Sequence, residues 1–360
     1  MTKKALIAMS GGVDSSVSAF LMKKQGYECM GANMRLYSNE DIGEDSTNTC
    51  CSLDDVSDAR AVANLLDMPF YVFNFQEEFK EYVIDNFISS YQHGVTPNPC
   101  IECNRHLKFA RFYKRARELG CDLVVTGHYA RIEQDENTGR WLLKKAIDPS
   151  KDQSYVLYSM NQDQLEHTRF PLGAMTKDEA RAIAAENGFI NAKKHDSQDI
   201  CFVPDGDYAS FIIRHTGKTF PEGDFVDEQG NVLGRHKGII HYTIGQRKGL
   251  GISSDRPYFV CNIDVERNQV VLTHDPNRSS TTLYADQLNL ISIEKIEEPI
   301  RVKAKIRYHH NEQWATVSMD GKDRIKVVFD EPQRAITKGQ AIVMYDGDLV
   351  VGGARIVECH

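Results

Sequence analysis

Short apolar runs alternate with amphipathic segments along the N-terminal part of the chain. Residues 5–9 are apolar, a Gly-rich turn follows, and apolar residues then recur at helical spacing until Gly26. The same pattern predicts further strands at 29–36, 70–75 and 123–126, and helices at 54–66, 77–91 and 106–119. Strands that alternate with helices indicate a doubly wound α/β fold with a parallel sheet, which binds ligands at the carboxyl ends of its strands.

The pattern changes after residue 205, where Gly and Pro become frequent and helical periodicity fades. Short alternating runs separated by turns then predict strands at 301–308, 313–317, 324–329, 341–344 and 350–357, which is typical of a small β-barrel. We therefore expect a catalytic α/β domain at 1–205, a small mixed central domain at 206–275 and a C-terminal β-barrel at 276–360.

The composition is ordinary for a globular protein, with 41% apolar and 26% charged residues among 360. The apolar run at 5–9 is too short for a signal peptide or a membrane span, so we expect a cytoplasmic protein with no membrane partner. Nine cysteines, an odd number in a long chain, argue against a disulfide framework. The net charge of −8 mildly disfavours a nucleic-acid partner but does not exclude one, because RNA binding depends on local patches.

The turn at 10–16 reads SGGVDSS and carries the strongest chemical signal. Small residues let backbone N–H groups approach a phosphate closely, and the start of the following helix adds partial positive charge. The turn lacks the Gly-Lys-Ser/Thr of a Walker loop and is not a dinucleotide fingerprint. A plain tight turn would not need two Gly and three Ser around an Asp, so the sequence favours a nucleotide-phosphate site.

Two cysteines, Cys100 and Cys103, lie in a Pro-rich segment that we expect to be a loop just before a helix. A helix N-terminus lowers the pKa of a thiol, so the pattern predicts a reactive Cys103. Cys201 lies far along the chain. The alternative is a structural zinc half-site or plain thiols, but zinc needs more ligands and the adjacent pair Cys50 and Cys51 has a poor spacing for it. Together with the nucleotide loop, thiol chemistry is favoured.

Basic residues recur on two predicted elements. The helix at 106–119 carries Lys108, Arg111 and Arg115 on one face, and basic residues alternate along the strand that begins at Arg301, so they share a face of the sheet. Such patches fit RNA, with phosphate contacts positioning the molecule, although a solvated charged surface is the alternative for each patch.

The loop resembles the S-G-G-x-D-S signature of the PP-loop ATP pyrophosphatases, which cleave ATP between the α and β phosphates and adenylate a carbonyl-type oxygen. Over nearly its whole length the chain further resembles the bacterial tRNA-specific 2-thiouridylases. The segments that carry this resemblance are AMSGGVDSS at 8–16, TPNPCIECN at 96–104, KF at 108–109, TGHYAR at 126–131, KDQSYVLY at 151–158, DSQDICF at 196–202 and IGQRKGLGI at 244–252.

The resemblance implies that ATP with Mg²⁺ adenylates the C2 oxygen of the wobble uridine of tRNA and that sulfur then replaces this oxygen. It implies that Cys201 carries a persulfide, that Cys103 is the partner nucleophile, and that the two end the cycle as a disulfide. The implied ATP-binding residues are Ala8, Met9, Ser10, Gly11, Gly12, Val13, Asp14, Ser15, Met34 and Gly127. The implied tRNA-binding residues are Asn98, Pro99, Cys100, His128, Lys151, Asp152, Gln153, Arg307, Tyr308 and Gln340.

The implied partners are tRNAs for Lys, Glu and Gln and a sulfur donor, either a persulfide-carrying protein or a cysteine desulfurase. The chain departs from some members at Cys100, where they have an Asp that is a candidate acid–base residue. That role is unfilled here, or falls to Cys100 or a water. The three thiols Cys100, Cys103 and Cys201 could instead hold a [4Fe–4S] cluster, which we rank below the persulfide chemistry.

Two other functions are open at this point. A PP-loop ligase or amide-forming activity on a small molecule would leave Cys103, Cys201 and the basic barrel strand unexplained. A non-catalytic RNA-binding protein would not need an intact nucleotide loop.

Overall fold

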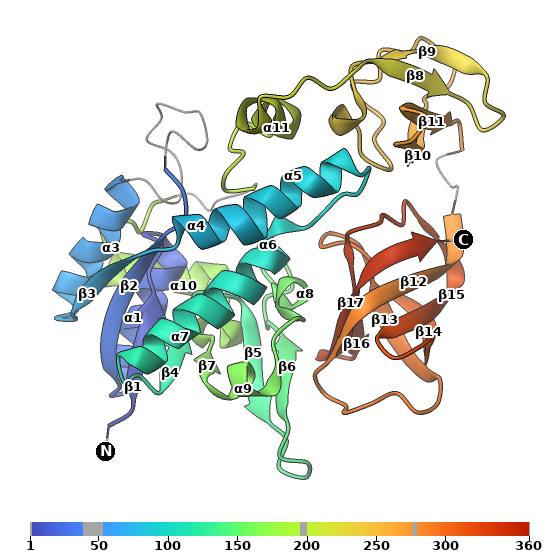
Figure 1. The fold of residues 1–360 in the computed structure, drawn as a ribbon. Coiled ribbons are helices and arrows are strands. Elements are labelled where there is room, and N and C mark those ends of the chain that lie inside the picture. The colour runs from blue at the N-terminus through green and yellow to red at the C-terminus, as the bar shows by residue number, and fades with distance from the viewer. Residues whose placement is uncertain (1, 39–52, 195–199, 276–278, 360) are drawn as a thin grey trace.

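The computed structural model describes residues 2–38, 53–194, 200–275 and 279–359. Cys50 and Cys51, and residues 196–199 of the DSQDICF segment, lie outside these ranges. Figure 1 shows three parts in chain order: an α/β layer, a small upper domain and a C-terminal barrel.

A five-stranded parallel sheet forms the centre of the first part, in the order β3-β2-β1-β4-β7. Its strands are β1 (Lys4–Ala8), β2 (Glu28–Arg35), β3 (Phe70–Asn74), β4 (Leu123–Val125) and β7 (Thr168–Arg169). The four longer strands lie where the apolar runs predicted them. The predicted α/β fold with a parallel sheet is confirmed, and the two-residue β7 was not foreseen because its sequence has no strand-length apolar run.

Helices cover both faces of this sheet, as the alternation along β1 shows. Leu6 packs with residues of the helices after β3 and in front of β4, whereas Ile7 packs with the helices that follow β1 and β2. The helices are α1 (Val13–Lys24), α3 (Leu53–Leu65), α4 (Gln76–Phe79), α5 (Asp85–Gln92), α6 (Pro99–Glu102), α7 (Phe112–Glu118), α8 (Ser154–Leu157), α9 (Gln162–Glu166) and α10 (Lys177–Glu186), with π-helical segments η1 (Lys80–Ile84) and η2 (Cys103–Arg111) and the 3-10 segment η3 (Pro171–Ala174).

The helix predicted at 106–119 begins earlier than expected. The chain is helical from Pro99 through Glu118, as α6, η2 and α7 in succession. Asn98 caps this run, since its side chain accepts a hydrogen bond from the Cys100 N–H, and Pro99 occupies the first helical position, where its missing N–H costs nothing. Cys100 and Cys103 therefore lie within the helix, and the loop predicted for them is wrong.

The second part consists of helix α11 (Tyr208–Thr216) and a four-stranded sheet in the order β10-β11-β8-β9. The strands are β8 (Gly223–Val226), β9 (Val232–His236), β10 (Phe259–Asp264) and β11 (Gln269–Thr273), and the 3-10 segment η4 (Ile239–His241) follows β9. Of the described helices, none has both the length and the apolar content needed to cross a membrane.

Six antiparallel strands form a closed barrel, because β12 pairs with both β15 and β17. They are β12 (Ser279–Leu290), β13 (Ile300–Lys305), β14 (Gln313–Met319), β15 (Arg324–Arg334), β16 (Ala341–Asp346) and β17 (Leu349–Cys359). The predicted barrel is confirmed, but its long first strand β12 was missed. A hairpin of β5 (Ala130–Gln134) and β6 (Trp141–Lys145) in the α/β part pairs with β17 and lies between the parallel sheet and the barrel (Figure 1).

Candidate active site

A pocket of about 360 Å³ opens at the carboxyl ends of β1, β2 and β4. It brings together residues that are far apart in the sequence, as expected for the ligand side of a parallel sheet. Of the predicted nucleotide residues it is lined by Ala8, Met9, Ser10, Asp14, Ser15, Met34 and Gly127, and of the predicted sulfur and tRNA residues by Pro99, Cys100, Cys103, His128, Gln153 and Cys201.

The nucleotide loop is held in one conformation by its own small residues. Gly11 has φ +81°, and a Cβ there would lie 2.3 Å from the backbone oxygen of Asp55, so only glycine fits. The Ser15 hydroxyl donates to the Gly12 carbonyl at 3.1 Å and accepts from the Ser10 N–H at 3.2 Å. Gly127 lets β4 approach the start of α1, since a Cβ would lie 2.9 Å from the carbonyl carbon of Asp14.

The Asp14 carboxylate is neutralised by a lysine that the sequence did not single out. Lys177, at the first position of α10, places its ammonium 2.7 and 2.8 Å from the two carboxylate oxygens. The Tyr129 hydroxyl donates to the same carboxylate at 2.9 Å. The Lys177 side chain is 9% exposed and the Asp14 side chain 31%, so the pair is only partly removed from water. The loop acid therefore already has a buried cation beside it.

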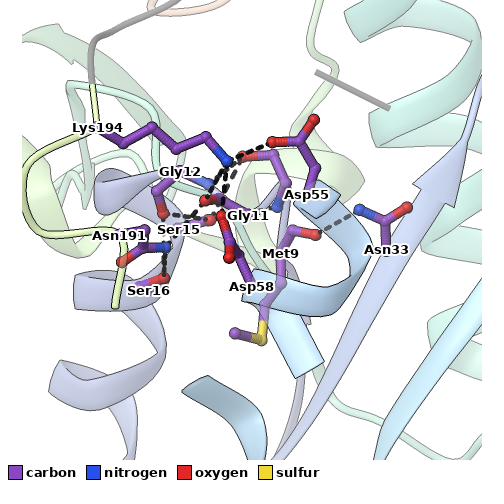
Figure 2. A network of polar contacts seen from close by, with 11 residues as sticks. Met9, Gly11, Gly12, Ser15, Ser16, Asn33, Asp55, Asp58, Asn191 and Lys194 are labelled. Carbon is purple, nitrogen blue, oxygen red and sulfur yellow. Dashed lines mark hydrogen bonds and ion pairs between the residues drawn. The ribbon is translucent and has the colours of Figure 1, made fainter. Parts of the chain in front are cut away.

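A second network ties the outside of the loop to α3 (Figure 2). Lys194 contacts Asp55 at 2.5 Å and Asp58 at 2.8 Å. Partial burial opposes the charged form, but the hydrogen bonds to both carboxylates raise the pKa of Lys194. Asn191 donates 2.9 Å hydrogen bonds to the Gly11 carbonyl and to the Ser16 hydroxyl. These contacts fix the backbone of the loop before any ligand binds.

The Cys103 thiol is buried, with 8% of the residue exposed, whereas Cys100 is exposed. Burial raises the pKa of Cys103, and the charge of Lys108 opposes this effect only in part. The lowered pKa that the sequence predicted for this thiol is therefore wrong for the chain alone. The reason is that Cys103 follows the first turn of the helical run and faces the protein interior.

The backbone of Cys201 is held beside the pocket by an aromatic cluster. The buried Tyr37 donates a 2.8 Å hydrogen bond from its hydroxyl to the Cys201 carbonyl. The next residue, Phe202, is 1% exposed and packs edge-on against Phe79 and Phe87. The Cys201 side chain itself is only partly buried and lines the pocket. A thiol in this setting can meet both a ligand in the pocket and a donor from outside.

The neutral His128 and the cation Lys108 line the same pocket as the loop and the thiols. His128 shares a 2.7 Å hydrogen bond with the Thr126 hydroxyl, and its Nε2 lies 3.5 Å from the Lys108 ammonium. Burial, together with the charge of Lys108, lowers the pKa of His128 well below its ordinary range, so the ring is neutral near pH 7. Lys108 itself lines the pocket, although the sequence predicted it on an outer, RNA-facing surface.

Several predicted tRNA residues lie outside this pocket and join parts of the chain. Arg307 donates to the carbonyls of Ile244 at 3.0 Å and Ala335 at 2.9 Å, which links the central sheet region to the barrel. Gln340 donates to the Thr96 carbonyl at 2.9 Å, just before the helix that carries the thiols. The structure thus gives these side chains partners within the chain.

The segment at 151–158 contacts the barrel as well. The Tyr308 hydroxyl donates to the Asp152 carbonyl at 3.1 Å, and Asp152 accepts hydrogen bonds from the N–H groups of Ala146 and Ser154. Lys151 is partly exposed. Whether these residues also contact tRNA stays a prediction.

No cluster of three or more His, Cys, Asp or Glu side chains in the described ranges has the arrangement to hold a metal ion. The thiols of Cys100, Cys103 and Cys201 line one pocket but do not form such a group. The iron–sulfur alternative stays a prediction.

Comparisons with known proteins agree with this arrangement. Family models match the tRNA methyl transferase HUP domain at 3–205, the tRNA methyl transferase PRC-barrel domain at 209–274 and the aminomethyltransferase beta-barrel domain at 280–356. A protein named tRNA-specific 2-thiouridylase MnmA from Clostridioides difficile (strain 630) is 56% identical, over 99% of this chain and 98% of its own length. The chain belongs to the tRNA-specific 2-thiouridylase family.

The chain is also similar to further proteins. The 2-thiouridylase MnmA of Clostridium beijerinckii is 50% identical over 99% of both chains. Among solved structures, NMN synthetase from Francisella tularensis has a TM-score of 0.33 and 16% identity, covering 61% of this chain and 79% of that one. A 4-thiouridine synthetase in complex with RNA and bound ATP has a TM-score of 0.35 and 19% identity, covering 60% and 50%.

The sequence did not reveal all the residues that shape this 2-thiouridylase site. Lys177, Lys194 and Tyr37 contact the loop or Cys201 only because the fold brings distant segments together, and none belongs to a motif quoted above. A Thr176-x-x-Glu179 capping box before Lys177 was a visible signal, but it predicts only where α10 begins.

Proposed function

We propose that the chain is a tRNA-uridine 2-sulfurtransferase that uses ATP. The observation that carries this proposal is the single pocket that joins a PP-loop at one end to Cys103 and Cys201 at the other. Relatives over the full length are named tRNA-specific 2-thiouridylase, which indicates sulfur rather than methyl transfer despite the wording of two domain descriptions.

The first step is adenylation at the loop end of the pocket. The loop N–H groups and Ser hydroxyls bind the phosphates of ATP, and Met34 and Gly127 flank the adenosine. The C2 oxygen of a wobble uridine, extruded from its stack, attacks the α-phosphorus, and pyrophosphate leaves. Mg²⁺ arriving with ATP would neutralise phosphate charge, and Asp14 supplies the carboxylate that would hold it. This step converts a poor leaving group into AMP.

The second step replaces the oxygen at the thiol end. The terminal sulfur of a Cys201 persulfide attacks C2, and AMP departs with the former C2 oxygen. Cys103 then attacks the Cys201 sulfur, which leaves the transferred sulfur on C2 and forms a Cys103–Cys201 disulfide. An external thiol reductant restores the two thiols. The partly exposed Cys201 suits loading by a separate donor, and the buried Cys103 suits a step that occurs only with tRNA bound.

Position 100 holds a cysteine, so no carboxylate is available there for the proton transfers of the reaction. Cys100 is exposed at the pocket, whereas burial and the charge of Lys108 lower the pKa of His128 and make its ring a poor proton acceptor, so we assign the proton transfers to Cys100 or a water. We assign tRNA contacts to the predicted residues at 98–100, to His128 and to the junction residues Arg307, Tyr308 and Gln340. The substrates are tRNAs for Lys, Glu and Gln, the donor is a persulfide-carrying protein or cysteine desulfurase, and the reaction takes place in the cytoplasm.

Deletion of the gene tests this function directly. Total tRNA from the deleted strain is digested and its nucleosides are measured by mass spectrometry. We expect the 2-thiouridine-type nucleosides to be lost and to return with the wild-type gene, but not with Cys201→Ser. Unchanged 2-thiouridine in the deleted strain would rule out the proposal. Iron analysis after anaerobic purification, with activity followed against iron content, tests the cluster alternative.

A further inference from the structure

We propose that Lys108 binds the α-phosphate of ATP and keeps hold of that phosphate when it moves to the uridine oxygen. This inference rests on the proposed function and adds a phosphate-binding residue to it. The sequence predicts Lys108 on a basic, RNA-facing surface of the helix at 106–119. The structure places its side chain in the pocket instead.

The charge balance of the pocket singles out Lys108. Among the described residues it is the only lysine or arginine that lines the pocket. The other two lysines near the loop are matched by acids, since Lys177 contacts Asp14 and Lys194 contacts Asp55. Within the described ranges Lys108 has no carboxylate at ion-pair distance, and its ammonium contacts the neutral His128. A half-buried cation without an acidic partner is unfavourable, so binding of an anionic ligand group would stabilise Lys108.

The local helix geometry holds the lysine in this place. Residues Cys103–Arg111 form a π-helical segment, in which hydrogen bonds span five residues. Lys108 follows Cys103 by five residues, which is the span of one π-helical hydrogen bond. The two side chains therefore share a face of the segment, and both line the pocket. π-helical turns occur frequently at functional sites. The flanking Leu107 and Phe109 are fully buried, so the segment cannot rotate without exposing them.

The position of Lys108 in the pocket also determines which phosphate of ATP it binds. Its ammonium lies 3.5 Å from His128, which follows Gly127, and Gly127 packs against the start of α1. Cys103, at the start of the same π-helical segment, lines the pocket together with Lys108. Only the α-phosphate is shared by ATP and the adenylated uridine, so it is the phosphate that must lie between the loop and the thiols. A fixed cation there stabilises the negative charge that develops when either pyrophosphate or AMP leaves.

Ligand binding separates a phosphate contact from a general effect on the fold. We would measure AMP and adenosine binding by calorimetry to the wild-type chain, Lys108→Met, Lys108→Arg and Lys114→Met. Lys114 is an exposed lysine of the same helical run and serves as the matched control. We expect Lys108→Met to weaken AMP binding about tenfold or more while leaving adenosine binding unchanged, and Lys108→Arg to restore most of the loss. Equal losses for AMP and adenosine, or no loss for AMP, would overturn the proposal.

Single-turnover reactions with tRNA then place the residue in the sequence of steps. Lys108→Met should slow adenylation of tRNA about 100-fold, which is the usual cost of removing one preorganised donor. If adenylation keeps its rate and only sulfur transfer fails, Lys108 acts on the thiols and the inference is wrong. If the wild-type chain binds AMP through Lys108 but never thiolates tRNA, the proposed function fails while the phosphate contact stands.

Discussion

The two ends of the pocket are built in different ways. At the loop end, Lys177 and Lys194 match the charges of Asp14, Asp55 and Asp58, and hydrogen bonds hold the backbone around Gly11. At the thiol end, Cys103 is buried among apolar side chains, His128 is neutral and Lys108 has no acid partner in the described chain. At the loop end the charges are matched by side chains of the protein itself. At the thiol end the charge of Lys108 is matched only when an anionic substrate binds. We infer that nucleotide binds to a preformed site and that tRNA organises the chemistry of the thiols.

Adding one methyl group to the loop should give the largest effect. Gly11→Ala places a Cβ 2.3 Å from the Asp55 carbonyl oxygen at a positive φ, which costs at least about 2 kcal/mol and shifts the loop. We expect ATP binding to be lost in calorimetry. Gly12→Ala is the control, because its φ is −88° and the nearest atom to its Cβ is a Ser10 side-chain oxygen at 3.5 Å. Equal effects of the two changes would contradict a rigid loop.

Removing the cation at the loop end should have the next largest effect. Lys177→Met leaves the Asp14 carboxylate without its closest charge partner, and we expect a loss of about 2 kcal/mol in the free energy of unfolding, since Asp14 is partly exposed. Asp14→Asn in the same chain should restore stability but not ATP binding. The measurement is a denaturant titration of the single and double variants. Additive losses would show that the pair does not interact.

The thiols should differ in their reactivity. The exposed Cys100 should react with iodoacetamide first, and the buried Cys103 at least about tenfold more slowly at pH 7. Because burial raises the pKa of Cys103, its thiolate fraction and alkylation rate should rise about tenfold per pH unit from pH 7 to 9 without levelling off. Peptide mapping by mass spectrometry gives each rate. A Cys103 rate that levels off below pH 8 would contradict the raised pKa.

The smallest effects concern the junction with the barrel. Arg307→Lys should lose the paired contacts to Ile244 and Ala335 and cost about 1 kcal/mol of stability. Lys303→Ala, at an exposed position on β13, should leave the unfolding midpoint unchanged, weaken tRNA binding a few-fold and lower its salt dependence. Thermal unfolding and filter binding at two salt concentrations separate the two roles. A loss of tRNA binding in Arg307→Lys without a loss of stability would make Arg307 a pure RNA contact.

Local pattern was enough to predict the parallel sheet and most of the barrel. The apolar runs are short and bounded by turns, and the SGGVDSS loop stands between a strand and a helix that both formed as predicted. Local pattern was not enough to predict the conformation and burial of the segment that carries Cys100 and Cys103. Asn98 and Pro99 start the helix before Cys100, so a segment that looked like a loop is helical and Cys103 is buried.

Contacts over long sequence separation could not be predicted at all. The bonds from Lys177 to Asp14 and from Tyr37 to Cys201 each span about 160 residues, and no local spacing encodes them. Lys108 shows the same limit within a helix, since an ordinary helical turn would place it on the outer face beside Arg111 and Arg115, whereas the π-helical segment turns it into the pocket.

We infer that the two ends of one pocket perform two separable steps. The direct measurement follows AMP transfer and sulfur transfer in one reaction, with unmodified tRNA, ATP labelled at the α-phosphate and a persulfide donor. Wild-type chain should release AMP and form 2-thiouridine. Cys201→Ser should transfer labelled AMP to tRNA without forming 2-thiouridine, and Gly11→Ala should do neither. Formation of 2-thiouridine by Cys201→Ser, or a failure of that folded variant to adenylate tRNA, would contradict the account.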